Sequence, residues 1–305
     1  MTRSRRSVRS ALLSLAVPWF RWQRELASAE RTMRLAAEHQ VRPEPYAPPR
    51  RLDRRVRIAV RREHGWPVYT VRPRTGAAPR RALYVHGGAW VHEISPWHWR
   101  LIAELAVRAD AEFTVPIHPL VPAGTAAGVV PAVADLAEAL VAEVGAARVT
   151  LLGDSAGGTI ALAAAMLLRD RGTAAPAEVV LIAPALDLRF TDPLIPRIQP
   201  RDPWLAVPGP RAAAEHWRGV LPLEDPLVSP LFGSLDGLGR ITLFTGTHDI
   251  TNADAHALAR RARAGGHRFE LHERPNLLHV YPLLPIPEGA EARRTMAAII
   301  RGPAT

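Results

Sequence analysis

Residues 149–158 read Val-Thr-Leu-Leu-Gly-Asp-Ser-Ala-Gly-Gly, and this stretch decides the fold. Its first four residues are apolar or β-branched, which is typical of a buried parallel strand. Residues 159–168 are rich in alanine and leucine and predict a helix. Gly-x-Ser-x-Gly between a strand and a helix indicates a nucleophile elbow centred on Ser155, a tight turn that needs small neighbours and exposes the serine hydroxyl. The N-terminus of the following helix then offers free N–H groups to developing negative charge.

The composition excludes several classes of chemistry. The 305 residues contain no cysteine, which rules out disulfides, thiolate metal sites and a cysteine nucleophile. The formal net charge is +10, but all 39 basic residues are arginines and they are spread along the chain. Such a distribution lacks the concentrated basic patch of a nucleic-acid site. We therefore expect no nucleic-acid partner.

Predicted strands and helices alternate along the chain. A hairpin is expected within residues 56–71. Further strands are expected at residues 82–85, 113–115, 179–183, 241–245 and 268–272, and further helices from residue 96 and at residues 131–143, 252–264 and 288–300. Ser95 is expected to cap the helix that begins at residue 96, with Trp97, Leu101 and Leu105 on its buried face. This alternation predicts an α/β fold with a mostly parallel, doubly wound sheet.

Two segments outside this alternation are predicted to form a helical cap. Residues 1–50 read as a helix and a proline-rich linker, ahead of a core at residues 51–305. The apolar stripe of that helix is expected to comprise Trp19, Trp22, Leu26, Ala29, Met33 and Ala36. Residues 190–230 are rich in proline and tryptophan and read as an insertion that supplies the second part of the cap.

The N-terminus also carries a weak targeting pattern. Arg5-Arg6 resembles a twin-arginine signal, but Pro18 interrupts the apolar run that follows, and this run is too short to span a bilayer. We expect a cytoplasmic protein, with peripheral membrane contact through the N-terminal helix as the alternative.

A serine nucleophile needs a histidine base and a carboxylate that orients the histidine. After an elbow of this kind the acid and then the base follow in the chain, each on a loop after a later strand. Asp249 follows the strand at 241–245, and His279 follows the last strand. Asp187, Asp254 and His272 are rivals near the same loops; Asp254 fits better as an acidic residue at a helix N-terminus, and His272 lies within or at the end of a strand.

An oxyanion needs preorganised N–H donors. One is the amide of Ala156, directly after the serine. The others are expected from Gly87 and Gly88 in the His-Gly-Gly-Ala-Trp segment at residues 86–90, where glycine permits close approach of the backbone. His86 is expected to anchor this loop by a hydrogen bond rather than to transfer protons.

The two motifs together resemble the hormone-sensitive-lipase-like family of α/β-hydrolases. The resemblance runs from about residue 83 to residue 279 and includes the order Ser155, Asp249, His279. It implies an α/β-hydrolase fold with a helical cap and an esterase or lipase that works through an acyl-serine intermediate without a cofactor or metal. By the same resemblance Asp154, inside the elbow, would support the site without being catalytic.

The chain departs from this family at three places. Ala89 replaces the third glycine of the usual His-Gly-Gly-Gly, which puts a third donor and the space for bulky alcohols in doubt. Residues 117–122 read Ile-His-Pro-Leu-Val-Pro and lack the glutamate of the family's Tyr-Arg-Leu-Ala-Pro-Glu run, and Val280 replaces the glycine after the histidine. None of these changes removes a triad residue.

The sequence therefore predicts a serine carboxylesterase or lipase that hydrolyses short- to medium-chain acyl esters of small apolar molecules. Three alternatives stay open: an amidase or deacetylase with the same triad, a non-catalytic ligand receptor on the same fold, and a basic membrane- or nucleic-acid-binding protein suggested by charge alone. A zinc metalloprotease is not expected, because His92-Glu93 is followed by Pro96 where a second zinc-binding histidine would stand.

Overall fold

The computed structural model describes residues 7, 9–10, 25–52 and 54–302. The predicted targeting arginines Arg5 and Arg6 and the stripe residues Trp19 and Trp22 lie outside the described residues. No helix in the described part is both long enough and apolar enough to cross a membrane.

Eight strands form a single sheet in the order β1-β2-β4-β3-β5-β6-β7-β8. They are β1 (Val56–Glu63), β2 (Trp66–Pro73), β3 (Arg80–Val85), β4 (Ala111–Pro116), β5 (Val149–Asp154), β6 (Glu178–Ile182), β7 (Arg240–His248) and β8 (Phe269–Leu278). β2 pairs antiparallel with both β1 and β4, and every other neighbouring pair is parallel. The mostly parallel α/β sheet predicted from the alternation is thereby confirmed.

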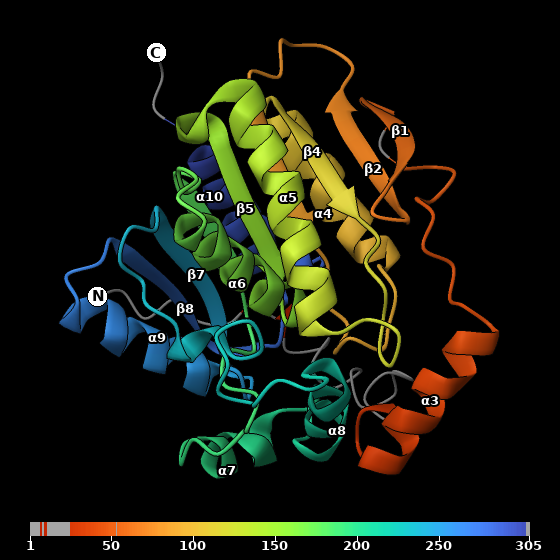
Figure 1. The fold of residues 1–305 in the computed structure, drawn as a ribbon, viewed down its shortest axis with the longest axis vertical. Helices are drawn as coiled ribbons and strands as arrows, with labels where there is room; N and C mark the ends of the chain where they lie inside the picture. Colours follow the sequence, from red (N-terminus) through yellow and green to blue (C-terminus); the bar gives the residue numbers. More distant parts are fainter. Residues whose placement is uncertain (1–6, 8, 11–24, 53, 303–305) are drawn as a thin grey trace.

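Helices cover both faces of the sheet (Figure 1). α4 (Pro96–Ala109) and α10 (Pro287–Arg301) lie on one face, and α5 (Ala126–Val144), α6 (Ala156–Asp170) and α9 (Asn252–Ala264) lie on the other. Successive side chains of a strand point to opposite faces, so β3 sends Ala82 and Tyr84 into the core beneath α4 and α10, and Leu83 and Val85 into the other core. A strand buried on both faces must be apolar throughout, which is why the sequence of the central strands shows no polar alternation.

Three further helices gather at one end of the sheet, beyond the carboxyl end of β5 (Figure 1). They are α3 (Ala29–Val41), α7 (Ile195–Ile198) and α8 (Pro208–Trp217). α8 packs closely on the N-terminal segment, since a Cβ atom on Gly209 would collide with the carbonyl of Leu26 before α3 and with the hydroxyl of Thr32 in α3. Trp217 is fully buried and stacks on Trp90 of the loop after β3, with 5.7 Å between the ring centroids. The N-terminal segment and the insertion thus contact each other and the core.

Two helices differ from the sequence prediction. α5 begins at Ala126 after the N-cap Thr125, five residues before the predicted start at Pro131, which lies inside the helix. Proline removes one backbone hydrogen bond there, and the burial of the side chains in the preceding turn, Val129 and Val130, outweighs this loss.

In α4 the buried face includes Leu101 and Leu105 as predicted, but Trp97 is 39% exposed and lies under the guanidinium of Arg100. Trp99 takes the buried place expected for Trp97 and donates a hydrogen bond from its indole N–H to the carbonyl of Tyr46.

The N-terminal stripe is also interrupted. Leu26 to Ser28 form a turn before α3, so one continuous helix does not run through them. Within α3, Thr32, Leu35 and Ala36 are buried and Ala29 is exposed. The predicted stripe was counted with one helical spacing across residues 26–28. Because the turn there interrupts the helix, residues before and after it no longer lie on one helical face.

Candidate active site

Ser155 occupies the sharp turn between β5 and α6, as the elbow motif predicts. Its backbone has φ +50° and ψ −122°, a conformation that non-glycine residues rarely adopt and that occurs at functional sites. The backbone N–H of Ser155 donates to the carbonyl of Ile182 at 2.9 Å, which holds the turn against β6. Gly157 must be glycine here, since a Cβ atom would collide with the carbonyl of Val85.

Ser155, His279 and Asp249 lie in a single line of hydrogen bonds, although they are far apart in the sequence. The Ser155 hydroxyl donates to Nε2 of His279 at 3.0 Å, and Nδ1–H of His279 donates to Oδ2 of Asp249 at 2.9 Å. The structure therefore brings together the three residues that the sequence analysis named.

Asp249 is fully buried, and the carboxylate oxygen that does not face His279 is also hydrogen-bonded. Oδ1 accepts both the backbone N–H and the hydroxyl of Thr251, each at 2.9 Å. Burial tends to lower the pKa of His279, but the charge of Asp249 and its hydrogen bond outweigh this effect and raise the pKa above its ordinary value of 6.5. An imidazole with this partner accepts a proton from serine more readily than a free one.

The residue after the histidine, Val280, is one of the departures noted above. Val280 has φ +46°, in the left-handed region where glycine carries no steric penalty and a β-branched residue does. The glycine expected from the family is therefore absent from a position whose backbone still favours it.

The loop after β3 supplies a different pair of amides from the pair predicted. The backbone N–H of Gly87 donates to Oδ1 of Asp154 at 3.0 Å and is not available to a substrate. The amides of Gly88, Ala89 and Ala156 make no hydrogen bond within the described part of the chain, and Gly88 and Ala89 line the pocket. Gly87 is thus corrected from a donor to an anchor, while the donor role of Gly88 and Ala156 stays a prediction.

Asp154 is the anchor of this loop. Besides Gly87, its carboxylate accepts the Tyr84 hydroxyl at 2.6 Å and Nε2–H of His98 at 3.1 Å. Burial tends to raise the pKa of Asp154, but these partners together hold the pKa below its ordinary value, so the carboxylate stays ionised. It fixes the position of the loop after β3 through the Gly87 amide.

His98 extends this network and was not found from the sequence. The backbone N–H of Ser95 donates to Nδ1 of His98 at 2.9 Å, which leaves the proton of the neutral ring on Nε2, facing Asp154. In the sequence, His98 stands three residues after the helix N-cap Ser95, where a side chain can hydrogen-bond back to the cap. This spacing is common at helix N-termini and does not indicate a contact with Asp154.

His86 lies at the base of the same loop. Its Nδ1–H donates to the carbonyl of Gly87 at 2.8 Å, and its ring stacks on His118 with 4.4 Å between centroids. Burial, together with the neighbouring histidines, lowers the pKa of His86 well below its ordinary value, so the ring is neutral. This contact is the loop anchor predicted for His86.

Asp202, from the insertion, is a second acidic residue beside the triad. Its Oδ2 accepts the backbone N–H of Ile250 at 2.9 Å, and its Oδ1 accepts the amides of Trp204 and Leu205. Burial and the negative charge of Asp249 raise the pKa of Asp202. No sequence pattern marks Asp202, because it approaches the loop of Asp249 only in the folded chain.

The rival residues are engaged elsewhere. Asp187 forms an ion pair with Arg189 at 2.7 Å, and His272 lies within β8 and stacks on Phe244. Asp254 lies in the first turn of α9, as expected, but its carboxylate accepts the backbone N–H groups of Leu186 and Asp187 instead of capping α9.

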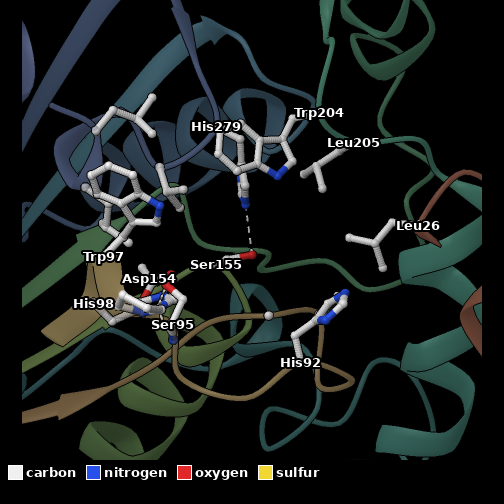
Figure 2. Close-up of a pocket in the computed structure, with 16 residues that line it drawn as sticks. Leu26, His92, Ser95, Trp97, His98, Asp154, Ser155, Trp204, Leu205 and His279 are labelled. Atoms are coloured by element: carbon white, nitrogen blue, oxygen red, sulfur yellow. Dashed lines mark hydrogen bonds and ion pairs between the residues drawn. The ribbon is translucent and has the colours of Figure 1, made fainter. Parts of the chain in front are cut away.

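A mainly apolar pocket of about 330 Å³ opens onto Ser155 (Figure 2). Its apolar lining consists of Leu26, Trp97, Trp204, Leu205, Val280, Leu283 and Leu284. Figure 2 shows His279 above the serine, Trp204 and Leu205 beside it, and Leu26 and His92 on the side of the N-terminal segment. Core, insertion and N-terminal segment all contribute to the pocket, which suits a small apolar group next to a reactive serine.

The described residues contain one group of histidines and carboxylates close enough to share a metal ion, namely His39, Glu44 and His92. None of the three belongs to the hydrogen-bonded line of Ser155, His279 and Asp249.

Comparison with known proteins identifies the family of this chain. A family model described as alpha/beta hydrolase fold matches residues 82–283. A triacylglycerol lipase of Mycobacterium tuberculosis is 36% identical over 201 residues, which are 66% of this chain and 41% of the lipase. The chain thus spans about two fifths of the length of that relative. An acetyl-hydrolase of Streptomyces hygroscopicus is 33% identical over 228 residues, 73% of this chain and 75% of the relative.

Among solved structures, an esterase from the bacterial hormone-sensitive lipase family has the same fold. The TM-score is 0.78 at 24% sequence identity, and the match covers 90% of this chain and 97% of the esterase. The chain belongs to the α/β-hydrolase family, which confirms the family and the fold recognised from its motifs.

Proposed function

We propose that this chain is a serine carboxylesterase that hydrolyses short- to medium-chain acyl esters of small apolar molecules. The observation that carries the proposal is the hydrogen-bonded line from Ser155 through His279 to Asp249, at 3.0 and 2.9 Å, at the floor of an apolar pocket. The names of the two curated relatives, a lipase and an acetyl-hydrolase, support ester chemistry.

In the first half of the reaction, Oγ of Ser155 attacks the ester carbonyl carbon while Nε2 of His279 takes the hydroxyl proton. The negative charge that forms on the carbonyl oxygen is stabilised by the amides of Gly88, Ala89 and Ala156. The C–O bond to the alcohol then breaks, and His279 returns its proton to the departing oxygen. The acyl group is left on Ser155.

In the second half, His279 removes a proton from water and the resulting nucleophile attacks the acyl-serine. Collapse of this intermediate releases the carboxylic acid and restores the Ser155 hydroxyl. Asp249 fixes the ring of His279 throughout and stabilises its positive charge. These steps need no cofactor.

The pocket supports a small apolar substrate. Its volume of about 330 Å³ is near the lower end of ligand pockets. We also propose that residues 1–50 and 190–230 act as the cap over a core at residues 51–305, because Leu26, Trp204 and Leu205 from these segments form part of the pocket wall.

The test is a panel of p-nitrophenyl esters of increasing acyl length, with the matching p-nitroanilides. Wild type should hydrolyse the shorter esters, with little turnover of the anilides. Ser155→Ala and His279→Ala should each lower kcat by at least about 10³-fold. Faster anilide than ester turnover would point to an amidase, and the absence of serine-dependent turnover on every compound would contradict the proposal.

A further inference from the structure

Three side chains from separate segments meet beside the pocket wall. His39 lies in the last turn of α3, Glu44 lies in the linker that follows, and His92 lies in the loop after β3. One nitrogen or oxygen atom from each lies within 4.8 Å of the other two. The meeting point joins the N-terminal segment to the loop that carries the oxyanion amides.

The hydrogen bond of His39 fixes which of its nitrogens faces the cluster. Nδ1 lies 2.7 Å from the carbonyl oxygen of Val91, which can only accept, so Nδ1 carries the proton. In the neutral ring Nε2 then presents a lone pair, and it lies 3.7 Å from Oε1 of Glu44. Metal-ligating histidines characteristically donate their other ring N–H to a carbonyl or carboxylate in this way.

Glu44 and His92 are held in place in the same manner. Oε2 of Glu44 accepts the backbone N–H of Glu93 at 3.1 Å and lies 3.2 Å from Nδ1 of His92. Nε2 of His92 lies 3.7 Å from Oε2 of Glu25. The His92 side chain is 1% exposed. Two carboxylates therefore accompany two imidazoles, of which the imidazoles are nearly buried and the Glu44 side chain is 31% exposed. A divalent cation would balance the charge of these carboxylates.

We propose that His39, Glu44 and His92 form a zinc site that fastens α3 to the loop after β3. Two imidazole nitrogens and one carboxylate oxygen are a common zinc donor set, and water would complete the tetrahedron. Zn–ligand bonds of about 2.0–2.1 Å place neighbouring ligand atoms about 3.3 Å apart. Oε2 of Glu44 lies 3.2 Å from Nδ1 of His92, which is close to that spacing. The other carboxylate oxygen, Oε1, lies 3.7 Å from Nε2 of His39, so the carboxylate group lies between the two rings.

Glu25 would not bind the metal itself but lies next to the ligand His92. When Nδ1 of His92 binds the metal, its Nε2–H faces the Glu25 carboxylate, which orients the ring and raises its basicity. The site would also fix one wall of the pocket, because His92 lines it. The site lies apart from the proposed catalytic residues, since no ligand belongs to the Ser155–His279–Asp249 line.

The test is zinc binding by the full chain. Protein stripped with EDTA would be titrated with ZnCl₂ by calorimetry, and bound zinc would be counted by elemental analysis after gel filtration. Wild type should bind one zinc ion per chain and show a Tm that rises with zinc concentration. His39→Ala and Glu44→Gln should each weaken binding by at least about a hundredfold and remove the rise in Tm.

Two features make this experiment decisive. His256→Ala is the matched control, because it removes a histidine that pairs with Glu273 at 2.7 Å away from this cluster, and it should bind zinc like wild type. Glu44→Gln keeps the shape of the side chain and decides the matter if His39→Ala does not fold. Zinc bound equally by wild type and Glu44→Gln, or no stoichiometric zinc in wild type, would overturn the proposal. In the first case the ion sits elsewhere, and in the second the cluster is only a hydrogen-bonded contact.

Discussion

At the scale of single residues, Asp154 connects the elbow to the loop after β3, which carries the proposed oxyanion donors. The same carboxylate binds the Gly87 amide, the Tyr84 hydroxyl and His98 Nε2–H. The position of the Gly88 and Ala89 amides therefore depends on a charged group that does not touch the reacting atoms. A buried carboxylate with all its hydrogen-bond partners in place restricts the movement of these partners, because breaking any one of the hydrogen bonds leaves a buried polar group unsatisfied.

We predict that Asp154→Asn lowers kcat by about tenfold or more and changes KM little. The amide would turn an N–H toward His98 Nε2–H or toward Gly87, so the loop would lose one of its contacts and the donors would shift from the oxyanion. Steady-state kinetics on a p-nitrophenyl ester would measure both constants. Tyr84→Phe, which leaves the Gly87 and His98 bonds intact, should have a smaller effect; an unchanged kcat in Asp154→Asn would contradict this account.

A second prediction at this scale concerns pH. The base must be neutral, and the pKa of His279 is raised above 6.5, so kcat/KM should fall on the acid side with a midpoint above pH 6.5. The ionised form of Asp202 adds to that shift, although burial and Asp249 raise the pKa of Asp202 itself to about 7, so this carboxyl is ionised only in part near the midpoint. Asp202→Asn should therefore move the midpoint to lower pH.

The control for this profile is Asp187→Asn, which neutralises another buried acid that is paired with Arg189 and not with the triad. Its midpoint should match wild type. A midpoint that stays in place in Asp202→Asn, or that moves to higher pH, would show that Asp202 does not act on His279 through its charge.

The sequence predicts the residues whose roles follow from local order along the chain. Ser155, Asp249 and His279 each follow a strand, and the carboxyl ends of parallel strands meet at one edge of the sheet. Whether the Gly87 amide is free depends on the side chain of Asp154, which is remote in sequence. Asp202 and His98 approach the site through tertiary packing alone, and local patterns carry no information on such contacts.

At the scale of elements, Asp254 ties α9 to the loop after β6. Its Oδ2 accepts the backbone N–H groups of Leu186 at 2.6 Å and Asp187 at 3.2 Å. Burial raises the pKa of Asp254 to about 7, against an ordinary value of 3.8. The folded chain therefore binds this proton more tightly than the unfolded chain. The stabilising effect is present below about pH 4 and is lost as the pH rises to 7.

We predict that Asp254→Asn raises the free energy of unfolding at pH 8 by on the order of 2 kcal/mol. The two backbone N–H groups donate to the same carboxylate oxygen. The side-chain carbonyl of asparagine can therefore accept both hydrogen bonds, and asparagine carries no charge that would have to be buried. Urea unfolding at pH 4 and pH 8 would measure the change, which should disappear at the lower pH. Asp236→Asn, at an exposed position, is the control. A destabilised Asp254→Asn at pH 8 would contradict this reasoning.

The predicted element boundaries hold for some elements and fail for others. α9 has the predicted bounds, residues 252–264, whereas α5 starts five residues early and β8 continues to Leu278. In both of the latter cases packing against neighbours extends an element past the point where local preference would end it. The longer β8 has a functional result, because it ends directly before His279.

At the scale of the whole molecule, segments from opposite parts of the sequence enclose one pocket. Leu26 precedes α3, Trp204 and Leu205 belong to the insertion, and Leu283 and Leu284 follow β8. The contact of α3 with α8 and the stack of Trp217 on Trp90 hold these parts against the core. The sequence predicted two cap segments but not that they pack on each other, since residues 190–230 show no helical period that would mark a contact face.

The central claim is that Ser155 is a nucleophile activated by His279, and covalent labelling tests it most directly. Wild type and Ser155→Ala would be incubated with a fluorophosphonate, and intact-mass spectrometry with peptide mapping would locate the adduct. The account predicts one adduct per chain, on Ser155, and none in Ser155→Ala. An unlabelled wild type, or equal labelling of Ser155→Ala, would contradict it.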